Sequence, residues 1–470
     1  ENRLQLIDYS AADLNTRGWI SQKGSVLRSR SVSNRLFSVS DDELQVIDAT
    51  DRDHPKVTAR LTLALNITDF LVLQNGYGVQ VTESDGKYTL RAVSLSDPES
   101  SKAVSETTPD DTSYSGAFVN GNLVYVVSNA YNYGIYPMMS YRPYGYGKTK
   151  IQVIDFSAPA SPVKRGKIEV DGSYYMAMNN TVSIYPYYSS GQILQMNGNK
   201  LIFPYSAGYY GPVLYATDAA TGTVTKSEET SKPQSGVRVI DLSDADTPKV
   251  LSELSLDITN GSGYFLNGTK LYFSYGTDIG YDEKKRPQSK YYLGRIDLSD
   301  PSKPLQLASI NIPGTCIGTD KTGTYAFTVN TEWGSNWSQS FTFNSVKLAD
   351  DKALLMSEVK LGSYFSSSFI ADGMVYLSGS GIMPIDISNP EKLTVYETGL
   401  KDSWASILSV KNRKIFASVS GGIACYNASN PANLTLDEIT EHYGYSRVAF
   451  SSDKAYIPMG YYGVWVKSLN

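Results

Sequence analysis

The side chains that most often carry catalysis and metal binding are scarce in this sequence. Its 470 residues include two His and two Cys. His54 and His442 fall in a predicted turn and a predicted connector, and two isolated His are too few for a His-based zinc or copper site. Cys316 and Cys425 belong to different predicted strands, so we interpret both as buried thiols and not as a disulfide. We expect no metal and no cofactor.

Carboxylates gather in predicted turns. Asp51 and Asp53 form one such pair, and Asp244 and Asp246 form another. These pairs could contribute to a cation site, but Asp at the start of a turn usually accepts a hydrogen bond from its own backbone two residues on. The sequence contains no G-x-S-x-G elbow, P-loop, EF-hand loop or C-x-x-C-H motif. We therefore assign no catalytic residue.

Tyrosine is the abundant functional side chain. The chain has 36 Tyr, and residues 131–215 hold 15 of them. Tyr offers a large flat apolar ring with a polar tip and little rotamer entropy to lose, which suits recognition surfaces. Self-packing of Gly/Tyr/Pro-rich loops is the alternative. The candidate binding residues are Tyr131, Tyr133, Tyr136, Tyr141, Tyr144, Tyr146, Tyr174, Tyr175, Tyr187, Tyr188, Tyr209, Tyr210, Trp333 and Trp337.

A repeated unit must position these residues. The stretch Gly236–Leu256 predicts a strand, an Asp-Pro-type turn and a second strand. Its Ile-Asp pair recurs, with shortest intervals of 39–41 residues, and longer intervals indicate insertions. The ten copies are Ile7-Asp8, Ile47-Asp48, Val93-Ser94, Ile154-Asp155, Ile240-Asp241, Ile296-Asp297, Val346-Lys347, Ile385-Asp386, Tyr426-Asn427 and Val466-Lys467.

Two further short β-rich runs precede each Ile-Asp strand after the first copy, and no stretch shows a sustained helical period. Four antiparallel strands in about 40 residues are typical of a β-propeller blade. A linear solenoid or tandem sandwiches would explain the constant hairpin less well. We predict one all-β domain over 1–470, with nine blades. Eight is the alternative if the Val346-Lys347 unit is misread.

The final copy, 447–470, predicts only three strands before the sequence stops. An N-terminal strand, either Leu4–Asp8 or Thr16–Ile20, is expected to complete this last blade and close the ring. The segments VRVIDLSDADTPKVLSEL (237–254), IQVIDFSAPASPVKRGKI (151–168) and LGRIDLSDPSKPLQLASI (293–310) resemble LVIVD-type repeats. The resemblance implies a secreted or cell-surface bacterial or archaeal β-propeller. It implies no catalytic residues.

The insertions are predicted to share one face. In a four-stranded blade, the loop between the second and third strands and the connector to the next blade leave from the same edge. The predicted insertions are 128–148, 171–190, 206–235, 276–289 and 331–339. Loops carried by a rigid scaffold often hold function, so we expect the binding face there.

One fragment inside the insertion 206–235 could be read as a cofactor motif. Residues 216–222, ATDAATG, are similar to the AxDxxTGxxxW docking motif of quinoprotein propellers. Here the fragment occurs once, and the Trp position is Lys226. A simple hairpin with Asp218 starting the turn is the better interpretation.

Composition limits the partners and the compartment. The net charge is −5 without a dominant basic tract, so no nucleic acid is expected. No apolar run approaches the roughly 18–20 residues of a membrane span. The sequence begins at Glu1, as a processed export substrate or a trimmed chain would. We expect secretion to the extracellular space, the cell surface or the periplasm.

Two functions fit these observations. The first is a non-enzymatic scaffold that holds a protein partner or a glycan on its Tyr-rich face, or serves as a subunit of a surface assembly. The second is a carbohydrate-active hydrolase or lyase with acid/base carboxylates in the propeller funnel. Redox chemistry through a bound cofactor lacks a ligand set.

Overall fold

In the computed structural model, all regular secondary structure in the described part of the chain is β-strand. The structure describes residues 2–131, 147–172, 175–176, 182–183, 192–206, 214–217, 224–227, 235–258, 261–283, 287–333, 339–362, 365–397, 399–401, 404–441 and 447–470. Contacts group the chain into two compact units. Unit 1 comprises Glu1–Ser113, Phe156–Pro162 and Ala449–Ser468, and unit 2 comprises Tyr114–Asp155, Val163–Val448 and Leu469–Asn470.

Unit 1 contains a hairpin and three sheets of antiparallel strands. The hairpin is β1 (Arg3–Tyr9) and β2 (Leu14–Ser21). The first sheet has β3 (Val26–Val32), β4 (Arg35–Ser40), β5 (Glu43–Asp48) and β6 (Lys56–Thr62). The second has β7 (Ile67–Val72), β8 (Tyr77–Ser84), β9 (Lys87–Ser94) and β10 (Ser105–Thr107). The C-terminal sheet has β40 (Ala449–Phe450), β41 (Lys454–Pro458) and β42 (Val464–Ser468).

Unit 2 begins with two sheets that frame the largest insertions. One is β11 (Gly116–Asn120), β12 (Leu123–Tyr131), β13 (Gly147–Asp155) and β14 (Val163–Asp171). The next is β15 (Tyr175–Met176), β17 (Gln192–Met196), β18 (Lys200–Ser206), β21 (Ser235–Asp241) and β22 (Lys249–Leu256). The hairpin β19 (Leu214–Thr217) and β20 (Val224–Ser227) lies between β18 and β21 in sequence.

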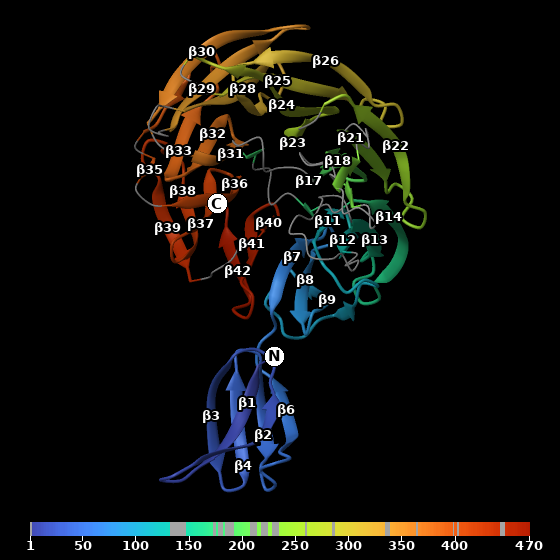
Figure 1. Cartoon of the computed structure of the whole chain (residues 1–470), viewed down its shortest axis with the longest axis vertical. Helices are drawn as coiled ribbons and strands as arrows, with labels where there is room; N and C mark the ends of the chain where they lie inside the picture. The colour runs from blue at the N-terminus through green and yellow to red at the C-terminus, as the bar shows by residue number, and fades with distance from the viewer. Residues whose placement is uncertain are drawn as a thin grey trace. The chain divides into compact units, whose positions relative to one another are not determined.

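The remaining sheets of unit 2 follow in chain order, with the first strand innermost and the fourth outermost (Figure 1). Two are β23 (Ser262–Asn267), β24 (Lys270–Tyr281), β25 (Pro287–Asp297), β26 (Leu305–Ile312), and β27 (Thr315–Thr319), β28 (Tyr325–Trp333), β29 (Gln339–Leu348), β30 (Ala353–Leu361). The others are β31 (Phe365–Ala371), β32 (Met374–Gly379), β33 (Gly381–Asp386), β34 (Thr394–Val395), β35 (Leu400–Lys401), and β36 (Ala405–Lys411), β37 (Lys414–Val419), β38 (Gly422–Asn427), β39 (Thr435–Thr440). Strand β16 (Val182–Ser183), which precedes β17 in the chain, pairs with β31 and is an edge strand of its sheet.

Most of the predicted units are sheets of four antiparallel strands. Except for Ile7-Asp8, which lies in β1 of the N-terminal hairpin, the Ile-Asp pairs lie in third strands. In that position, the Asp accepts a hydrogen bond from the backbone N–H two residues on. Examples are Asp241 Oδ1 from Ser243 N at 2.9 Å and Asp297 Oδ1 from Ser299 N at 2.8 Å. The repeated Asp is therefore a cap for the Asp-Pro turn, as its residue type predicts. In the last copy, the register pairs Lys454 with Ser468, which moves the equivalent pair one residue on from Val466-Lys467 to Lys467-Ser468.

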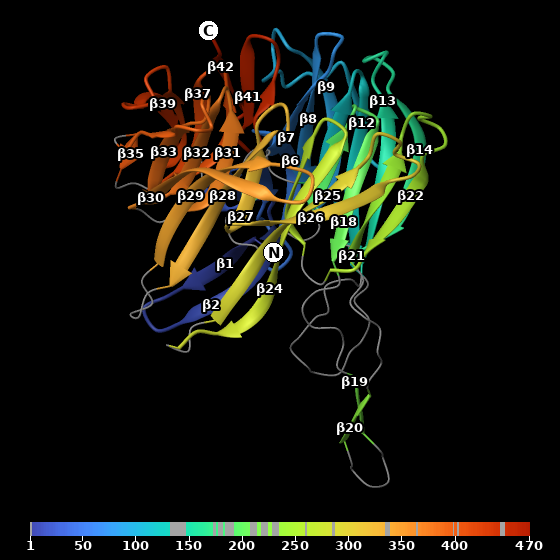
Figure 2. The same ribbon diagram turned by 90° about the horizontal axis from the view of Figure 1, so that it is seen from above.

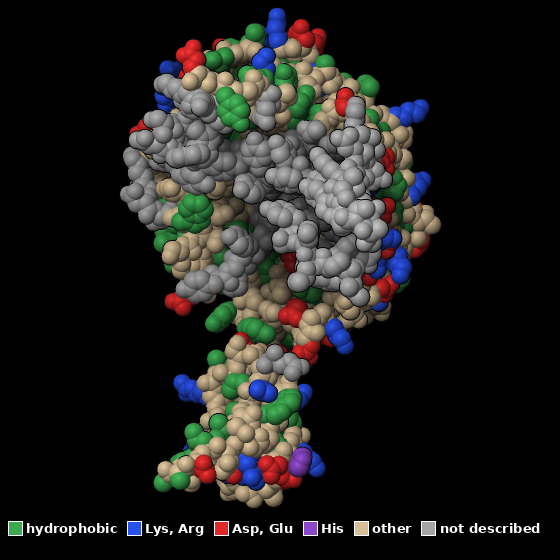
Figure 3. Space-filling model, viewed as in Figure 1, with side chains coloured by type: hydrophobic (Ala, Val, Ile, Leu, Met, Phe, Trp, Pro, Cys, Tyr) green, Lys and Arg blue, Asp and Glu red, His purple; other side chains and the backbone are tan. Residues whose placement is uncertain are grey.

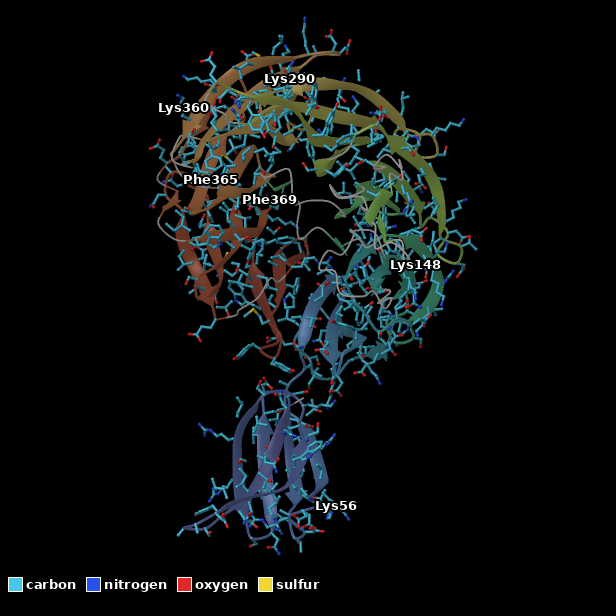
Figure 4. The ribbon with its side chains drawn as sticks, in the orientation of Figure 1. Lys56, Lys148, Lys290, Lys360, Phe365 and Phe369 are labelled. Atoms are coloured by element: carbon cyan, nitrogen blue, oxygen red, sulfur yellow. The ribbon has the colours of Figure 1, made fainter. Side chains whose placement is uncertain are left out.

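Successive sheets bury large side chains against each other. Tyr125 of one sheet packs with Phe203 of the next, and Phe327 packs with Leu377 of its own successor. The core is thus a series of apolar layers between sheets. Figure 4 labels Phe365 and Phe369 on β31, and these two rings enter different layers. A sheet with both faces covered in this way satisfies its backbone within the ladder and its apolar side chains between ladders.

At two junctions, a strand of one sheet also binds the Asp-Pro turn of the next sheet through a backbone hydrogen bond and an ion pair. On β14, Gly166 N donates to Ala245 O at 2.8 Å, and Arg165 pairs with Asp246 at 2.6 Å. On β2, Gly18 N donates to Arg52 O at 2.8 Å, and Arg17 pairs with Asp53 at 3.0 Å. The two junctions are equivalent, because each Arg also forms a second ion pair with the Asp of its own sheet. Arg165 lies 3.3 Å from Asp155, and Arg17 lies 3.4 Å from Asp8.

The N-terminal strand differs from the expectation. Either Leu4–Asp8 or Thr16–Ile20 is expected to complete the last sheet, but Leu4 pairs with Ile20 and Asp8 with Asn15. The two segments form a hairpin with each other, joined by a turn in which Ser10 N donates to Asp13 O at 2.8 Å. Strand β2 also contacts the β3–β6 sheet through the Gly18 junction. Within the described residues, the C-terminal sheet has three strands. Blade number and ring closure remain predictions.

Gly166→Ala should destabilise the protein. The added Cβ would lie 2.2 Å from Asp246 O and 2.5 Å from Pro248 Cδ, so the junction must open. We expect the free energy of unfolding to fall by about 1–3 kcal/mol, measured by urea denaturation. The control is Gly276→Ala, whose nearest neighbour is 3.9 Å away and which should change it by less than about 0.5 kcal/mol. Equal effects of the two substitutions would contradict the role of the junction.

Asp241→Asn should remove an acid-sensitive part of the stability. Burial alone would raise the pKa of Asp241, but hydrogen bonds from Lys200 and Ser243 lower it to about 2. This contribution is present above the unfolded pKa of about 4 and is lost as the pH falls toward 2. We expect a loss of about 1 kcal/mol at pH 7, allowing for solvent screening, because Asn keeps the cap and loses the 2.8 Å ion pair to Lys200. Urea denaturation at pH 7 and 2.5 should show the difference shrinking at low pH; a constant difference would contradict this.

Candidate functional site

Unit 2 carries its insertions between second and third strands. In each of its meandering sheets these connections and the connector to the next sheet leave from one edge, here called the loop edge. The turns that join first to second and third to fourth strands leave from the other, the turn edge. The long connections at the loop edge are 132–146, 207–234, 282–286 and 334–338.

Most of the candidate binding residues lie outside the described residues. These are Tyr133, Tyr136, Tyr141, Tyr144, Tyr146, Tyr174, Tyr187, Tyr188, Tyr209, Tyr210 and Trp337. The backbone is described for Tyr131, Tyr175 and Trp333, which lie in β12, β15 and β28. What the structure gives for this site is therefore the set of strands from which the loops leave.

The first loop leaves from a closed ladder. Tyr131 and Gly147 pair directly across β12 and β13. Below them, the buried Thr149 hydroxyl lies 2.7 Å from Asn129 Oδ1 and 2.8 Å from Gly172 O. Lys148, labelled in Figure 4, forms an ion pair with Glu169 of β14. Hydrogen bonds thus fix both ends of the loop to the scaffold.

The second insertion leaves from an aromatic and charged cluster. The guanidinium of Arg238 lies 4.8 Å over the ring of Tyr205 and 3.1 Å from Glu253. Tyr205 donates its hydroxyl proton to Glu253 at 2.9 Å. Burial alone would raise the pKa of Glu253, but the hydrogen bonds from Arg238 and Tyr205 lower it. The carboxylate stays ionised at neutral pH and holds the cluster together.

A row of aromatic rings runs along the β23–β25 hairpins to the loop edge. Tyr264 stacks on Phe273 at 5.1 Å, Phe273 meets Tyr275 at 6.2 Å, and Tyr275 stacks on Tyr292 at 5.2 Å. The first two rings are buried and the last two are half-buried. Beyond them β24 continues to Tyr281, which is 75% exposed. We call this set the aromatic row.

The connector 171–190 does more than join two sheets. Its residues Val182 and Ser183 pair antiparallel with Ser368 and Ser367 of β31, the first strand of a sheet three further along the chain. Strand β16 also contacts β23 and β27, the first strands of the two intervening sheets. The chain's own backbone thus occupies the space beside these three inner strands.

A groove that the sequence did not predict lies at the turn edge. Its volume is about 1080 Å³. Turns from three consecutive sheets line it, through Asp320, Tyr325, Asp372, Asn412 and Arg413 among others. Tyr325 N donates to Asp320 Oδ1 at 2.8 Å, and Arg413 N donates to Asp372 Oδ2 at 3.4 Å. Both carboxylates therefore act as acceptors for turn backbone, and single turns in the sequence gave no signal that they would meet.

The remaining assignments concern metals and thiols. Cys316 and Cys425 are buried thiols that form no disulfide with each other, as predicted, and burial raises the pKa of Cys316 to about 12. His54 is exposed in its turn, 3.1 Å from Asp51, and His442 lies outside the described residues. No cluster of three His, Cys, Asp or Glu that could bind a metal occurs in the described ranges. There is also no helix there that could cross a bilayer.

The cofactor-like fragment forms part of a hairpin. Ala216 pairs with Thr225 and Thr217 with Val224, so β19 and β20 flank the tip. Figure 2 shows this hairpin beyond the ends of β18 and β21. The hairpin interpretation is confirmed for the two strands, and Asp218 and Gly222 lie outside the described residues.

No protein-family model matches the chain, and no curated protein matches it either. Among solved structures, the chain is similar to the computationally designed Ika8 protein, with 9% identity, a TM-score of 0.46, and coverage of 86% of this chain and 97% of that one. For the β-propeller domain of the Trilobed protease from Pyrococcus furiosus, the values are 12%, 0.35, 76% and 97%. For BamB from Moraxella catarrhalis they are 9%, 0.34, 95% and 98%. Likenesses at this level carry no argument, so the blade assignment rests on the sheets of this chain.

Tyr264→Phe should not destabilise the protein. The Tyr264 hydroxyl is buried without a hydrogen-bond partner among the described residues, and burial raises its pKa. Removing a buried unpaired hydroxyl should leave the free energy of unfolding unchanged or raise it by up to about 1 kcal/mol. Tyr205→Phe is the matched control, because it loses the 2.9 Å bond to Glu253 and should lower the value by about 1 kcal/mol. Denaturation of both variants checks this; a destabilised Tyr264→Phe would show a missing partner.

Proposed function

We propose that this protein is a non-enzymatic scaffold that holds a protein partner or a glycan at its loop edge. The aromatic row is the observation that carries the proposal. Its ring contacts run from the buried Tyr264 through Phe273 to the half-buried Tyr275 and Tyr292, so core packing supports rings that reach the surface. Further along β24, Tyr281 is exposed. Aromatic side chains fixed in this way suit recognition, because they contribute large contact areas and lose little entropy on binding.

The tyrosine-rich loops leave from the same edge of neighbouring sheets. The loop 132–146 and the insertion 207–234 belong to the two sheets that precede the aromatic row in the chain. In this proposal, their tyrosines extend the row into a wider binding face. Recognition of a protein or of a sugar would use the same chemistry, in which rings stack on apolar faces and hydroxyls bond to polar groups.

The alternative, a hydrolase or lyase, has less support. Asp320 and Asp372 are the carboxylates of the groove, and each accepts a hydrogen bond from turn backbone. The inner strands β23, β27 and β31 have strand β16 beside them, in the place where the funnel site was expected. These contacts favour a structural role for both regions.

The broader assignments belong to this proposal. We propose a ring of nine blades of the LVIVD-repeat type, on a secreted or cell-surface protein that can act in a larger assembly. The repeat intervals, the third-strand position of the Ile-Asp pairs and the Asp caps support it.

Replacing residues 132–146 with Asn-Gly should abolish association and leave the fold intact. Tyr131 and Gly147 are directly opposed, so a two-residue turn can join them without moving β12 or β13. The intact protein and this variant would be purified side by side from the native source, and the attached molecules identified by mass spectrometry and sugar analysis. We expect the attached partner to be lost from the variant.

A second variant provides the matched control. Asp372→Asn and Arg413→Ala alter the groove at the turn edge and should leave the partner attached. The thermal midpoint of the loop variant should lie within a few degrees of that of the intact protein. A loop variant that keeps its partner, or a groove variant that loses it, would overturn the proposal.

A further inference from the structure

One apolar face of the sheet β3–β6 is partly exposed to solvent. The equivalent face of the other described sheets compared below is covered. The faces can be compared at one position of the second strand. This residue pairs with the third-strand residue that lies two positions before the repeated Asp or its equivalent, as Ile202 pairs with Val239 before Asp241. In the other sheets this side chain is at most 2% exposed: Val79, Tyr125, Ile202, Tyr272, Phe327, Tyr376, Phe416 and Tyr456. In β3–β6 it is Phe37, opposite Val46, and both are only half-buried.

The apolar residues around Phe37 are also partly exposed to solvent. Val39 and Leu44 are paired on the same face and are half-buried. At its margins, Val32 is 51% and Leu61 58% exposed. Figure 3 shows hydrophobic side chains among polar ones on the surface of β1–β6. We call this surface the Phe37 face.

The equivalent face of other sheets shows what should cover it. Tyr272 packs on Cys316 and Ala326 of the next sheet in the chain, and Tyr376 packs on Ile407 and Ile415 of its own successor. The occupant is in each case the following sheet. For the Phe37 face, the following sheet is β7–β10.

The link between these two sheets is short enough for direct packing. Residues 63–66 join β6 to β7. Elsewhere, connectors of similar length, 257–261, 313–314 and 362–364, join sheets that pack on each other. On the opposite face of β3–β6, Ser38, Gln45 and Ile47 are buried, and the Gly18 junction joins the N-terminal hairpin to this sheet.

In the structure, the C-terminal sheet packs on the face of β7–β10 where the Phe37 face would be expected to dock. Tyr456 stacks on Phe70 at 5.2 Å, and Ile67 and Gly460 exchange two backbone hydrogen bonds of 3.0 Å. Tyr456 is the register equivalent of Phe37, and its strand partner Val466 is the equivalent of Val46. The same face of β7–β10 is therefore the natural receptor for either sheet.

We propose that the Phe37 face docks on β7–β10 of the same chain in exchange with the C-terminal sheet. The two sheets present equivalent side chains, so they compete for Phe70 and cannot both contact it. Docking of β3–β6 would insert an additional sheet between the C-terminal sheet and β7–β10. The inference does not depend on the binding role of the loop edge.

Paired cysteines test the exchange in the full chain. Phe37→Cys with Phe70→Cys should cross-link when β3–β6 is docked, and Tyr456→Cys with Phe70→Cys when the C-terminal sheet is docked. The thiols would be joined with dibromobimane and read by fluorescence and peptide mapping; Cys316 and Cys425 are buried in both variants. We expect both pairs to cross-link within one chain. Adding Tyr456→Ala to the first pair should raise its yield at least threefold, because the competitor is weakened.

A second cysteine pair leaves Phe70 unchanged, in case the substitution of Phe70 prevents folding. Val464 N lies 3.3 Å from the exposed Glu99, and Leu44 is the register equivalent of Val464. Leu44→Cys with Glu99→Cys should therefore cross-link as well. Absence of both Phe37 and Leu44 cross-links, with or without Tyr456→Ala, would overturn the proposal. Cross-links found only between two chains would also overturn it, because the occupant would then be a second copy.

Discussion

The sheets of unit 2 from β17 to β34 bury apolar side chains on both faces, and water must be kept from both faces. The structure meets this constraint by stacking sheets, with one large second-strand side chain such as Tyr272 or Phe327 buried on the next sheet. At the Gly166 and Gly18 junctions, the preceding strand also binds the Asp-Pro turn of the next sheet through a backbone hydrogen bond and an ion pair. Because these contacts lie between the sheets, the edges of the sheets can carry long loops without loss of the core.

The repeat in the sequence predicted the local structure well. The Ile-Asp pairs gave the third strand and its turn, since an Asp that caps a turn and a Pro that ends a ladder act through neighbouring residues. Burial of Cys316 followed equally from the pattern of its strand. These features depend on contacts a few residues apart, and such contacts can be read from spacing.

Long-range pairings could not be read in this way. The residues of Leu4–Asp8 specify a third strand, but nothing in them says whether its partner is Thr16–Ile20 or a strand at the far end of the chain. The pairing of Val182–Ser183 with β31 also has no local signal. The turn-edge groove could not be predicted either, because Asp320, Asp372 and Arg413 come from three separate turns that each resemble an ordinary capped turn. Each outcome depends on which sheets become neighbours.

The pairing of β16 with β31 also bears on how the chain is made. A ribosome completes the sheets in order, and a sheet can begin to pack as soon as its neighbour has emerged. Val182 and Ser183, however, leave the ribosome long before Ser367 and Ser368 exist. During synthesis, the pairing of β16 must therefore wait while three later sheets are built. It is a late event of biogenesis, and a nascent chain halted before β31 would lack it.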